Sequence, residues 1–222
     1  MVKVLTNSQG KVYTSSGKAL IAPSDTPSRY QLLDRVKDDN NNEIGTVSGF
    51  FTDANDVEYA VVCLDAQYRA TKSWCSNTTT IITNLPRYYN LSTSNVWESK
   101  ETATFNTQKI LDFCTANGYT SQACTHCRSK SFTISGTVYY GQLPNVIELC
   151  DIAKRYNAIE ARDTSSSSYT SSNFASARNI WASNQHTASE AFYLFTMGFM
   201  TYQTKSNESR FAVPVLEIPN AL

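Results

Sequence analysis

Residues 143–149 read LPNVIEL, residues 180–183 read IWAS, residues 191–195 read AFYLF and residues 212–215 read AVPV. The first segment predicts a helix that begins after Pro144, because Asn145 can accept a backbone N–H as the N-cap and apolar residues follow at helical spacing as far as Tyr156. The other three predict a strand containing Trp181, a hairpin around Gly198 and a closing strand. A helix followed by antiparallel strands indicates an α+β fold.

The residues before this region predict two further strands and a second helix. Residues 47–51 and 57–64 read as strands joined by a hairpin turn at residues 53–56. The acidic turn lacks the glycine and the distal glutamate of an EF-hand loop, so a plain turn is favoured over a calcium site. Residues 106–110 open the helix with Asn106 as its cap, and Asn117-Gly118 ends it. Residues 67–103 form a long irregular insert that contains Trp74 and Trp97.

The amino-acid composition limits the classes of protein to which this chain can belong. The chain has 222 residues, 41% of them hydrophobic, so it can bury a real core, and its 19 basic and 19 acidic side chains cancel. Without a basic stripe we expect no nucleic-acid partner, and without an apolar run of roughly 18 residues we expect no membrane span. The first residues lack the apolar core of a signal peptide, so we expect synthesis in a host cytoplasm.

The six cysteines are expected to be reduced thiols, because the sequence shows no export signal. Cys114 and Cys150 fall on apolar helix faces, where cysteine behaves as a small hydrophobe. Cys124 and Cys127 make half of a zinc site whose second half has no counterpart pair, so buried thiols are favoured and no metal or other cofactor is expected. His126 and His186 lack a visible Ser or Cys relay, and we expect no enzymatic activity.

The N-terminal residues predict an attachment segment rather than a domain. Two Gly-Lys turns each precede apolar residues in residues 1–24. A segment this short cannot bury those side chains alone, so it either interlocks with partner chains or forms a mobile tail, and the first is favoured. Residues 22–27 form a proline linker, and a short helix with one apolar stripe follows. The candidate anchor and oligomerisation residues are Val12, Tyr13, Leu20, Ile21, Tyr30, Leu33 and Val36.

Residues 43–219 resemble the C-type-lectin-like domain found in phage fibres and at the C-terminus of collagen-like bacterial adhesins. The resemblance is carried by the Asn-Thr-Gln start of the first helix, by Cys124 and Cys127, by Leu143-Pro144 and by the tryptophan strand, in that order. It implies a lectin-like head with two helices and a twisted antiparallel sheet over residues 43–222, preceded by an extended segment over residues 1–42.

The chain departs from the family pattern at several positions. Gly141 and Gln142 stand where the family commonly has Trp and Arg, Val213 stands where Arg often precedes the proline, and Phe192 replaces a frequent tryptophan. The Trp-Asn-Asp triplet and the cis-proline pair of calcium-dependent sugar-binding lectins are missing. The resemblance therefore implies the fold and a display role, but not calcium.

Together these features favour a phage virion fibre or decoration protein, on the head or the tail, that displays its head domain for attachment to a glycan or protein of the host surface. Its expected partners are capsid or tail proteins and copies of itself, a trimer being favoured over a dimer. The alternatives are a bacterial lectin-like surface module and a purely structural decoration protein. Trp181 is expected in the core, and the ligand loops are expected at residues 165–173 and 184–187. The candidate ligand-binding residues are Tyr169, Asn173, Gln185 and His186.

Overall fold

The computed structural model describes residues 28–83, 85, 101–163, 179–194 and 200–221, together with three short strands near the N-terminus. The chain divides into two compact units, of which one comprises Met1–Arg29 with Asn220–Leu222 and the other comprises Tyr30–Pro219. The larger unit thus includes residues 30–42, which the sequence assigned to the N-terminal segment. No helix among the described residues is long and apolar enough to cross a membrane.

The smaller unit contains an antiparallel sheet of three very short strands. They are β1 (Leu5–Thr6), β2 (Val12–Tyr13) and β3 (Ala19–Ile21), in the order β1-β2-β3. Val12 lies opposite Ile21, and Tyr13 lies opposite Ala19. The prediction that Val12, Tyr13, Leu20 and Ile21 are strand residues is confirmed, whereas their role in attachment stays a prediction.

The first sheet of the larger unit has four antiparallel strands in the order β14-β6-β5-β4. They are β4 (Arg35–Lys37), β5 (Glu43–Thr52), β6 (Glu58–Leu64) and β14 (Val215–Pro219). The predicted turn between β5 and β6 is confirmed. Asp53 Oδ1 accepts the N–H groups of Asn55 and Val57 at 2.8 and 3.0 Å, so this carboxylate closes the turn.

The short helix expected around Tyr30, Leu33 and Val36 is wrong. Leu33 has a φ of 67°, which no right-handed helix accommodates, and the chain continues as strand β4, in which Val36 lies opposite Gly45. Arg35 stabilises this strand, because its guanidinium donates to both carboxylate oxygens of Asp65 at 2.7 Å. Tyr30 and Leu33 are partly buried and Val36 is 1% exposed against the core of its own chain. The stripe therefore gives no support to an oligomer interface.

The described residues of the larger unit form three helices, where the sequence predicted two: α1 (Ala103–Asn117), α2 (Gln122–Arg128) and α3 (Val146–Glu160). Asn145 caps α3 as predicted, and Glu148 completes a capping box. Gly118 ends α1 as predicted, with a φ of 70°. The predicted cap of α1 is wrong, because Thr102 caps it and Asn106 lies inside the helix, where its buried amide donates to Ser183 Oγ at 3.1 Å.

A second sheet carries the strands of the C-terminal part. Its order is β12-β11-β10-β13-β7, and its pairs are antiparallel except for β10 with β13. The strands are β7 (Ala70–Thr71), β10 (Ile180–Gln185), β11 (Glu190–Leu194), β12 (Met200–Thr204) and β13 (Phe211–Ala212). A separate hairpin joins β8 (Ser131–Ile134) to β9 (Thr137–Tyr140), and a 3-10 turn covers Ala66–Tyr68.

Two expectations about strands need correction. The AVPV segment is not one closing strand, because β13 and β14 flank Val213-Pro214 and belong to different sheets. The predicted irregular insert contributes β7 to the second sheet, and its Trp74 is fully buried. Trp97 lies outside the described residues.

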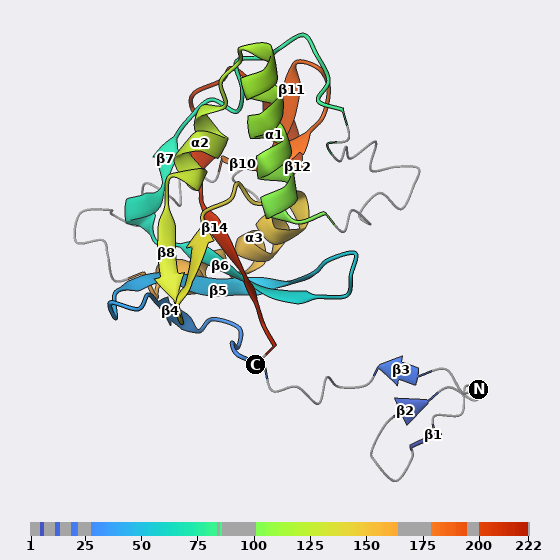
Figure 1. Cartoon of the computed structure of the whole chain (residues 1–222), viewed down its shortest axis with the longest axis vertical. Coiled ribbons are helices and arrows are strands. Elements are labelled where there is room, and N and C mark those ends of the chain that lie inside the picture. The colour runs from blue at the N-terminus through green and yellow to red at the C-terminus, as the bar shows by residue number, and fades with distance from the viewer. Residues whose placement is uncertain are drawn as a thin grey trace. The chain divides into compact units, whose positions relative to one another are not determined.

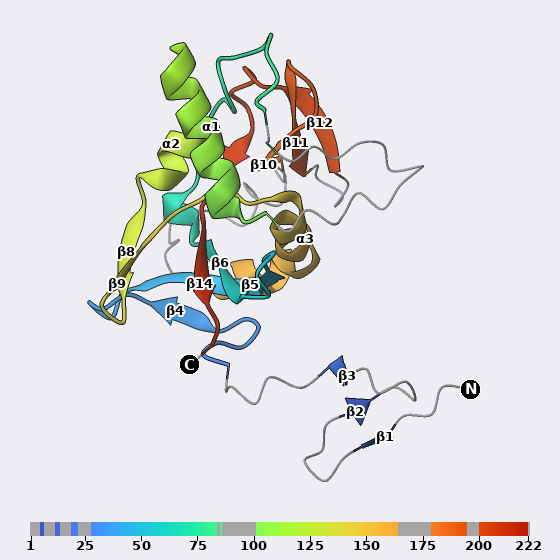
Figure 2. The same ribbon diagram turned by 45° about the vertical axis from the view of Figure 1, so that its right-hand side comes forward.

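Helix α3 lies against both sheets, as Figures 1 and 2 show, while α1 packs against β10 and α2 against β13. The core cluster around α3 includes Val61 of β6, Ile152 of α3 and Ile180 of β10. Gly49 permits the close approach of α3 to β5, since a Cβ there would lie 2.8 Å from the Cβ of Asp151. Trp181 is fully buried, as expected, in a second cluster that contains Cys114 and Cys124.

Candidate functional site

An exposed group of aromatic rings lies at the β11–β12 hairpin. The two strands are antiparallel, with Phe192 opposite Tyr202 and Glu190 opposite Thr204, so Phe192 and Tyr202 project from the same face. The chain leaves β10 at Gln185 and turns through residues 186–189 before β11 begins, which brings His186 to these rings. We call His186, Phe192 and Tyr202 the aromatic platform.

The rings of the platform are in stacking contact. The His186 ring is parallel to Tyr202, with centroids 4.1 Å apart and an interplanar angle of 8°, and its edge meets Phe192 at 5.1 Å and 83°. Tyr202 is 49% exposed, and the His186 side chain is 25% exposed. Phe192 is partly buried against the core. A core residue thus supports two polar-tipped rings that reach solvent, an arrangement typical of binding surfaces.

Glu190 holds the imidazole in place. His186 Nδ1 lies 3.3 Å from Glu190 Oε2, and Thr187 Oγ1 donates to the same oxygen at 3.2 Å. Because a carboxylate only accepts hydrogen bonds, Nδ1 carries the proton, and in the neutral ring Nε2 becomes an acceptor. The backbone N–H groups of His186 and Thr187 also donate to the carbonyl of Glu190, at 2.9 and 3.1 Å. The platform is therefore rigidly positioned.

Of the two predicted ligand-binding residues that the structure describes, His186 lies on this surface and Gln185 does not. Tyr169 and Asn173 lie outside the described residues. Gln185 is fully buried at the end of β10, not in a loop, and its amide bonds the N–H and the carbonyl of Ile82 at 3.0 and 2.6 Å. The assignment of Gln185 to a binding surface is therefore wrong, because tertiary pairing with the insert occupies its side chain.

Tyr202 and Glu190 were not among the binding residues predicted from the sequence. The predicted hairpin around Gly198 could have indicated Tyr202, because pairing of its two strands places one aromatic residue of each strand on the same face.

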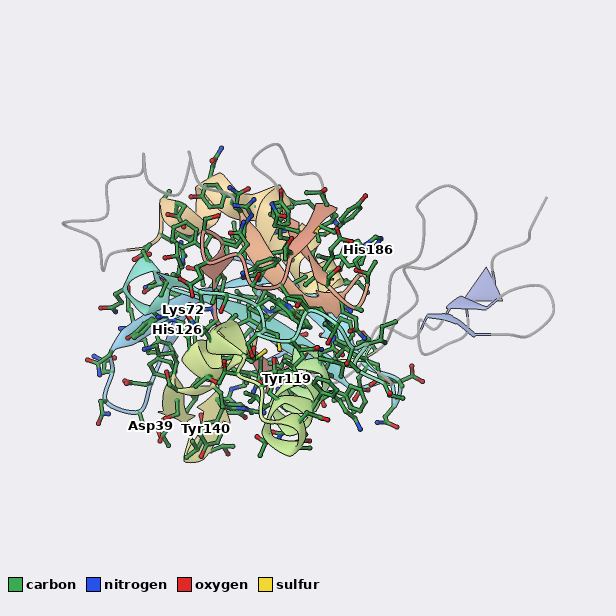
Figure 3. All side chains as sticks on the ribbon, turned by 90° about the horizontal axis from the view of Figure 1, so that it is seen from above. Asp39, Lys72, Tyr119, His126, Tyr140 and His186 are labelled. Carbon is green, nitrogen blue, oxygen red and sulfur yellow. The ribbon has the colours of Figure 1, made fainter. Side chains whose placement is uncertain are left out.

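Figure 3 shows His186 beside these strands and His126 elsewhere, on α2. His126 Nε2 bonds the carbonyl of Tyr68 at 2.8 Å, and burial lowers its pKa. The two histidines therefore do not form one site.

The suspected zinc pair lies in the core. Cys124 and Cys127 on α2 are fully buried, and burial raises the pKa of Cys124 to about 12 and that of Cys127 well above its ordinary value. Within the described ranges no group of three or more His, Cys, Asp or Glu side chains is placed to hold a metal ion. All six cysteines are free thiols in the structure.

Comparison with known proteins gives no relative. No family model, no curated protein and no solved structure matches the chain.

Proposed function

We propose that this chain is a phage virion fibre or decoration protein whose lectin-like head attaches to a glycan or protein of the host surface. The observation that carries the proposal is the aromatic platform, where the stacked His186 and Tyr202 rings are held at the surface by Glu190. The N-terminal segment would join the head to capsid or tail proteins, and identical chains would associate, a trimer being favoured.

The chemistry of the platform suits recognition of a sugar or of a protein side chain. An exposed ring offers a large apolar face at low conformational cost, while the Tyr202 hydroxyl and the imidazole offer hydrogen bonds at its edge. Because Glu190 and Phe192 already fix the imidazole, binding requires little further ordering. The low charge of the whole chain, 17% of residues, is compatible with an uncharged polar ligand.

The lectin-like interpretation is supported by contacts among the segments that carry the resemblance. The N–H of Leu143 donates to Thr107 Oγ1 of α1 at 3.0 Å, and the N–H of Val146 donates to Asn184 Oδ1 of β10 at 3.0 Å. The first-helix motif, the Leu-Pro motif and the tryptophan strand are thus joined by buried hydrogen bonds.

The test is attachment of the purified protein to intact bacterial cells and to their isolated surface glycans. The double variant His186→Ala with Tyr202→Ala should lose roughly tenfold or more in affinity, which is the order expected when two aromatic contacts are removed. Its melting temperature should stay within about 2 °C of the parent, since both rings reach solvent and the hairpin register remains.

The matched control is Tyr140→Ala, which removes a tyrosine of similar exposure, 50%, from strand β9. Attachment should be unchanged in this variant. An equal loss in Tyr140→Ala would place the binding surface on the β8–β9 hairpin, and normal attachment of the double variant would overturn the role of the platform. Binding to cells but not to isolated glycans would identify a protein ligand.

A further inference from the structure

Two cysteines from distant parts of the sequence meet in the core beside α1. Cys75 follows β7, and Cys114 lies in the last turn of α1, 39 residues later. Their sulfur atoms are 3.3 Å apart, and the two residues are 0% and 3% exposed. A disulfide bond is about 2.05 Å long, so the two sulfurs need to approach by about a further 1.2 Å to bond.

The surroundings of Cys75 favour its thiolate. The N–H of Asn77 donates to Cys75 Sγ at 3.4 Å. Lys205 is fully buried nearby, where its Nζ lies 5.2 Å from the centre of the Trp74 ring and donates to the carbonyl of Ala188 at 2.7 Å. The hydrogen bond from Cys114, followed by the Asn77 N–H and the positive charge of Lys205, lowers the pKa of Cys75 to about 7.

Cys114 is the complementary partner. Its hydrogen-bond contact with Cys75, together with burial, raises the pKa of Cys114, which favours the protonated form of this thiol. Burial disfavours the thiolate form of other buried cysteines, because it raises the pKa of Cys63 to about 11 and that of Cys124 to about 12. One thiolate beside one protonated thiol is the arrangement of a nucleophilic cysteine with a resolving cysteine.

We propose that Cys75 and Cys114 form a redox-active dithiol that a small peroxide converts to a reversible intramolecular disulfide. The Cys75 thiolate attacks one oxygen of hydrogen peroxide, the O–O bond breaks, and the hydroxide released takes a proton to become water. Cys114 then attacks the sulfur of the resulting sulfenic acid, an S–S bond forms, and the displaced hydroxide leaves as water with the Cys114 proton. Two thiols are oxidised, and one peroxide is reduced to two waters.

Burial determines which oxidant reacts. Because Cys75 is 0% exposed, a bulky disulfide such as oxidised glutathione reaches it poorly, whereas peroxide is close to water in size. The product ties the segment after β7 to α1, and the same segment is bound further along by the hydrogen bond from the Ile82 N–H to Gln185. The site thus senses peroxide without forming mixed disulfides.

The experiment on the unmodified protein is peroxide treatment at pH 7.5 followed by thiol counting after denaturation. Six free thiols should become four, and dithiothreitol should restore six. Trypsin should release residues 73–87 joined to residues 110–128, and fragmentation should place the link at Cys114. The rate of thiol loss should rise with pH around a midpoint near 7, the pKa of Cys75. Retention of six thiols, a link to Cys124 or Cys127, or a midpoint near 9 would overturn the proposal.

Variants separate the two roles. Cys114→Ser should lose one thiol to a sulfenic acid that dimedone traps, with no crosslink. Cys150→Ser removes a cysteine outside the pair and should lose the usual two thiols and form the same link. A crosslink that survives in Cys114→Ser contradicts the assignment, as does a crosslink that is lost in Cys150→Ser.

Discussion

Two glutamates meet where two helices begin. Glu217 of β14 accepts the N–H groups of Ala103 and Thr104 at 2.8 and 2.9 Å, at the start of α1. Glu148 of α3 is 1% exposed and accepts the N–H of Asn145 at 2.8 Å through Oε2. Within the described residues no donor reaches Glu148 Oε1. Burial, followed by the charge of Glu217 and a hydrogen bond to it, raises the pKa of Glu148 well above its ordinary value. The raised pKa favours the protonated form of the Glu148 carboxyl.

The raised pKa of Glu148 predicts a pH dependence of stability. Glu148 has a higher pKa in the folded chain than in the unfolded chain, so its contribution is complete below about 4.5 and is lost as the pH rises through the folded value. Between those values the free energy of unfolding should fall by up to about 1.4 kcal/mol per pH unit. Glu148→Gln keeps an acceptor for Asn145 and a donor for Glu217, so this loss should disappear.

The measurement is denaturant unfolding of both proteins from pH 5 to pH 9. Other titrating groups, including Asp151 on the same helix, are common to both proteins, so the difference between the two curves isolates Glu148. Parallel curves would show that Glu148 is ionised in the folded chain.

At the scale of elements, the ends of α3 and α1 show which local signals determine structure. Asn145 Oδ1 accepts the N–H of Glu148 at 2.9 Å, and its amide nitrogen donates to the carbonyl of Glu101 at 3.3 Å. The cap thus starts α3 and also ties it to the residue before the cap of α1. Burial of Asn145, which is 1% exposed, strengthens the dependence of both helices on this side chain.

Asn145→Ala should lower the free energy of unfolding by about 1–2 kcal/mol, because it removes the cap and leaves the partly buried carbonyl of Glu101 with one partner fewer. The matched control is Asn157→Ala, the same substitution at an exposed position inside α3, which should be neutral or slightly stabilising. Equal effects in urea unfolding would mean that the cap contributes nothing beyond helix propensity.

Signals that act within one turn were predictable from the sequence, and those set by distant partners were not. The cap at Asn145, the stop at Gly118 and the Asp53 turn depend on residues at most four positions away. The strand at Arg35 depends on Asp65, and the burial of Gln185 depends on Ile82, so spacing alone misassigned both. Only His186 of the aromatic platform was predicted from the sequence, because it lies in a turn that local residues indicate. Its contact with Tyr202 depends on the pairing register of β11 and β12, which local sequence does not show.

At the scale of the whole molecule, two tryptophans join distant segments of the larger unit. Trp74 Nε1 donates to the carbonyl of Ala182 at 2.7 Å, and Trp181 Nε1 donates to the carbonyl of Lys72 at 2.8 Å. Both side chains are fully buried, so each ring contributes apolar burial while its N–H remains satisfied. Since these contacts lie within Tyr30–Pro219, we expect the larger unit to fold without the N-terminal strands.

The N-terminal strands belong to the smaller unit, which is predicted to work in assembly. Its strands are only two or three residues long, and a unit below roughly 40 residues usually needs a partner, a metal or a disulfide. Light scattering of the full chain should therefore give a mass of about three times 24.7 kDa, with the β1–β3 sheet completed by identical chains.

Deleting residues 1–24 keeps the pairing of Ser28 with Ala221. The truncated chain should be a monomer with an almost unchanged melting temperature, and it should no longer join the proposed virion. A full-length monomer at micromolar concentration, or normal incorporation of the truncated chain, would contradict the anchor.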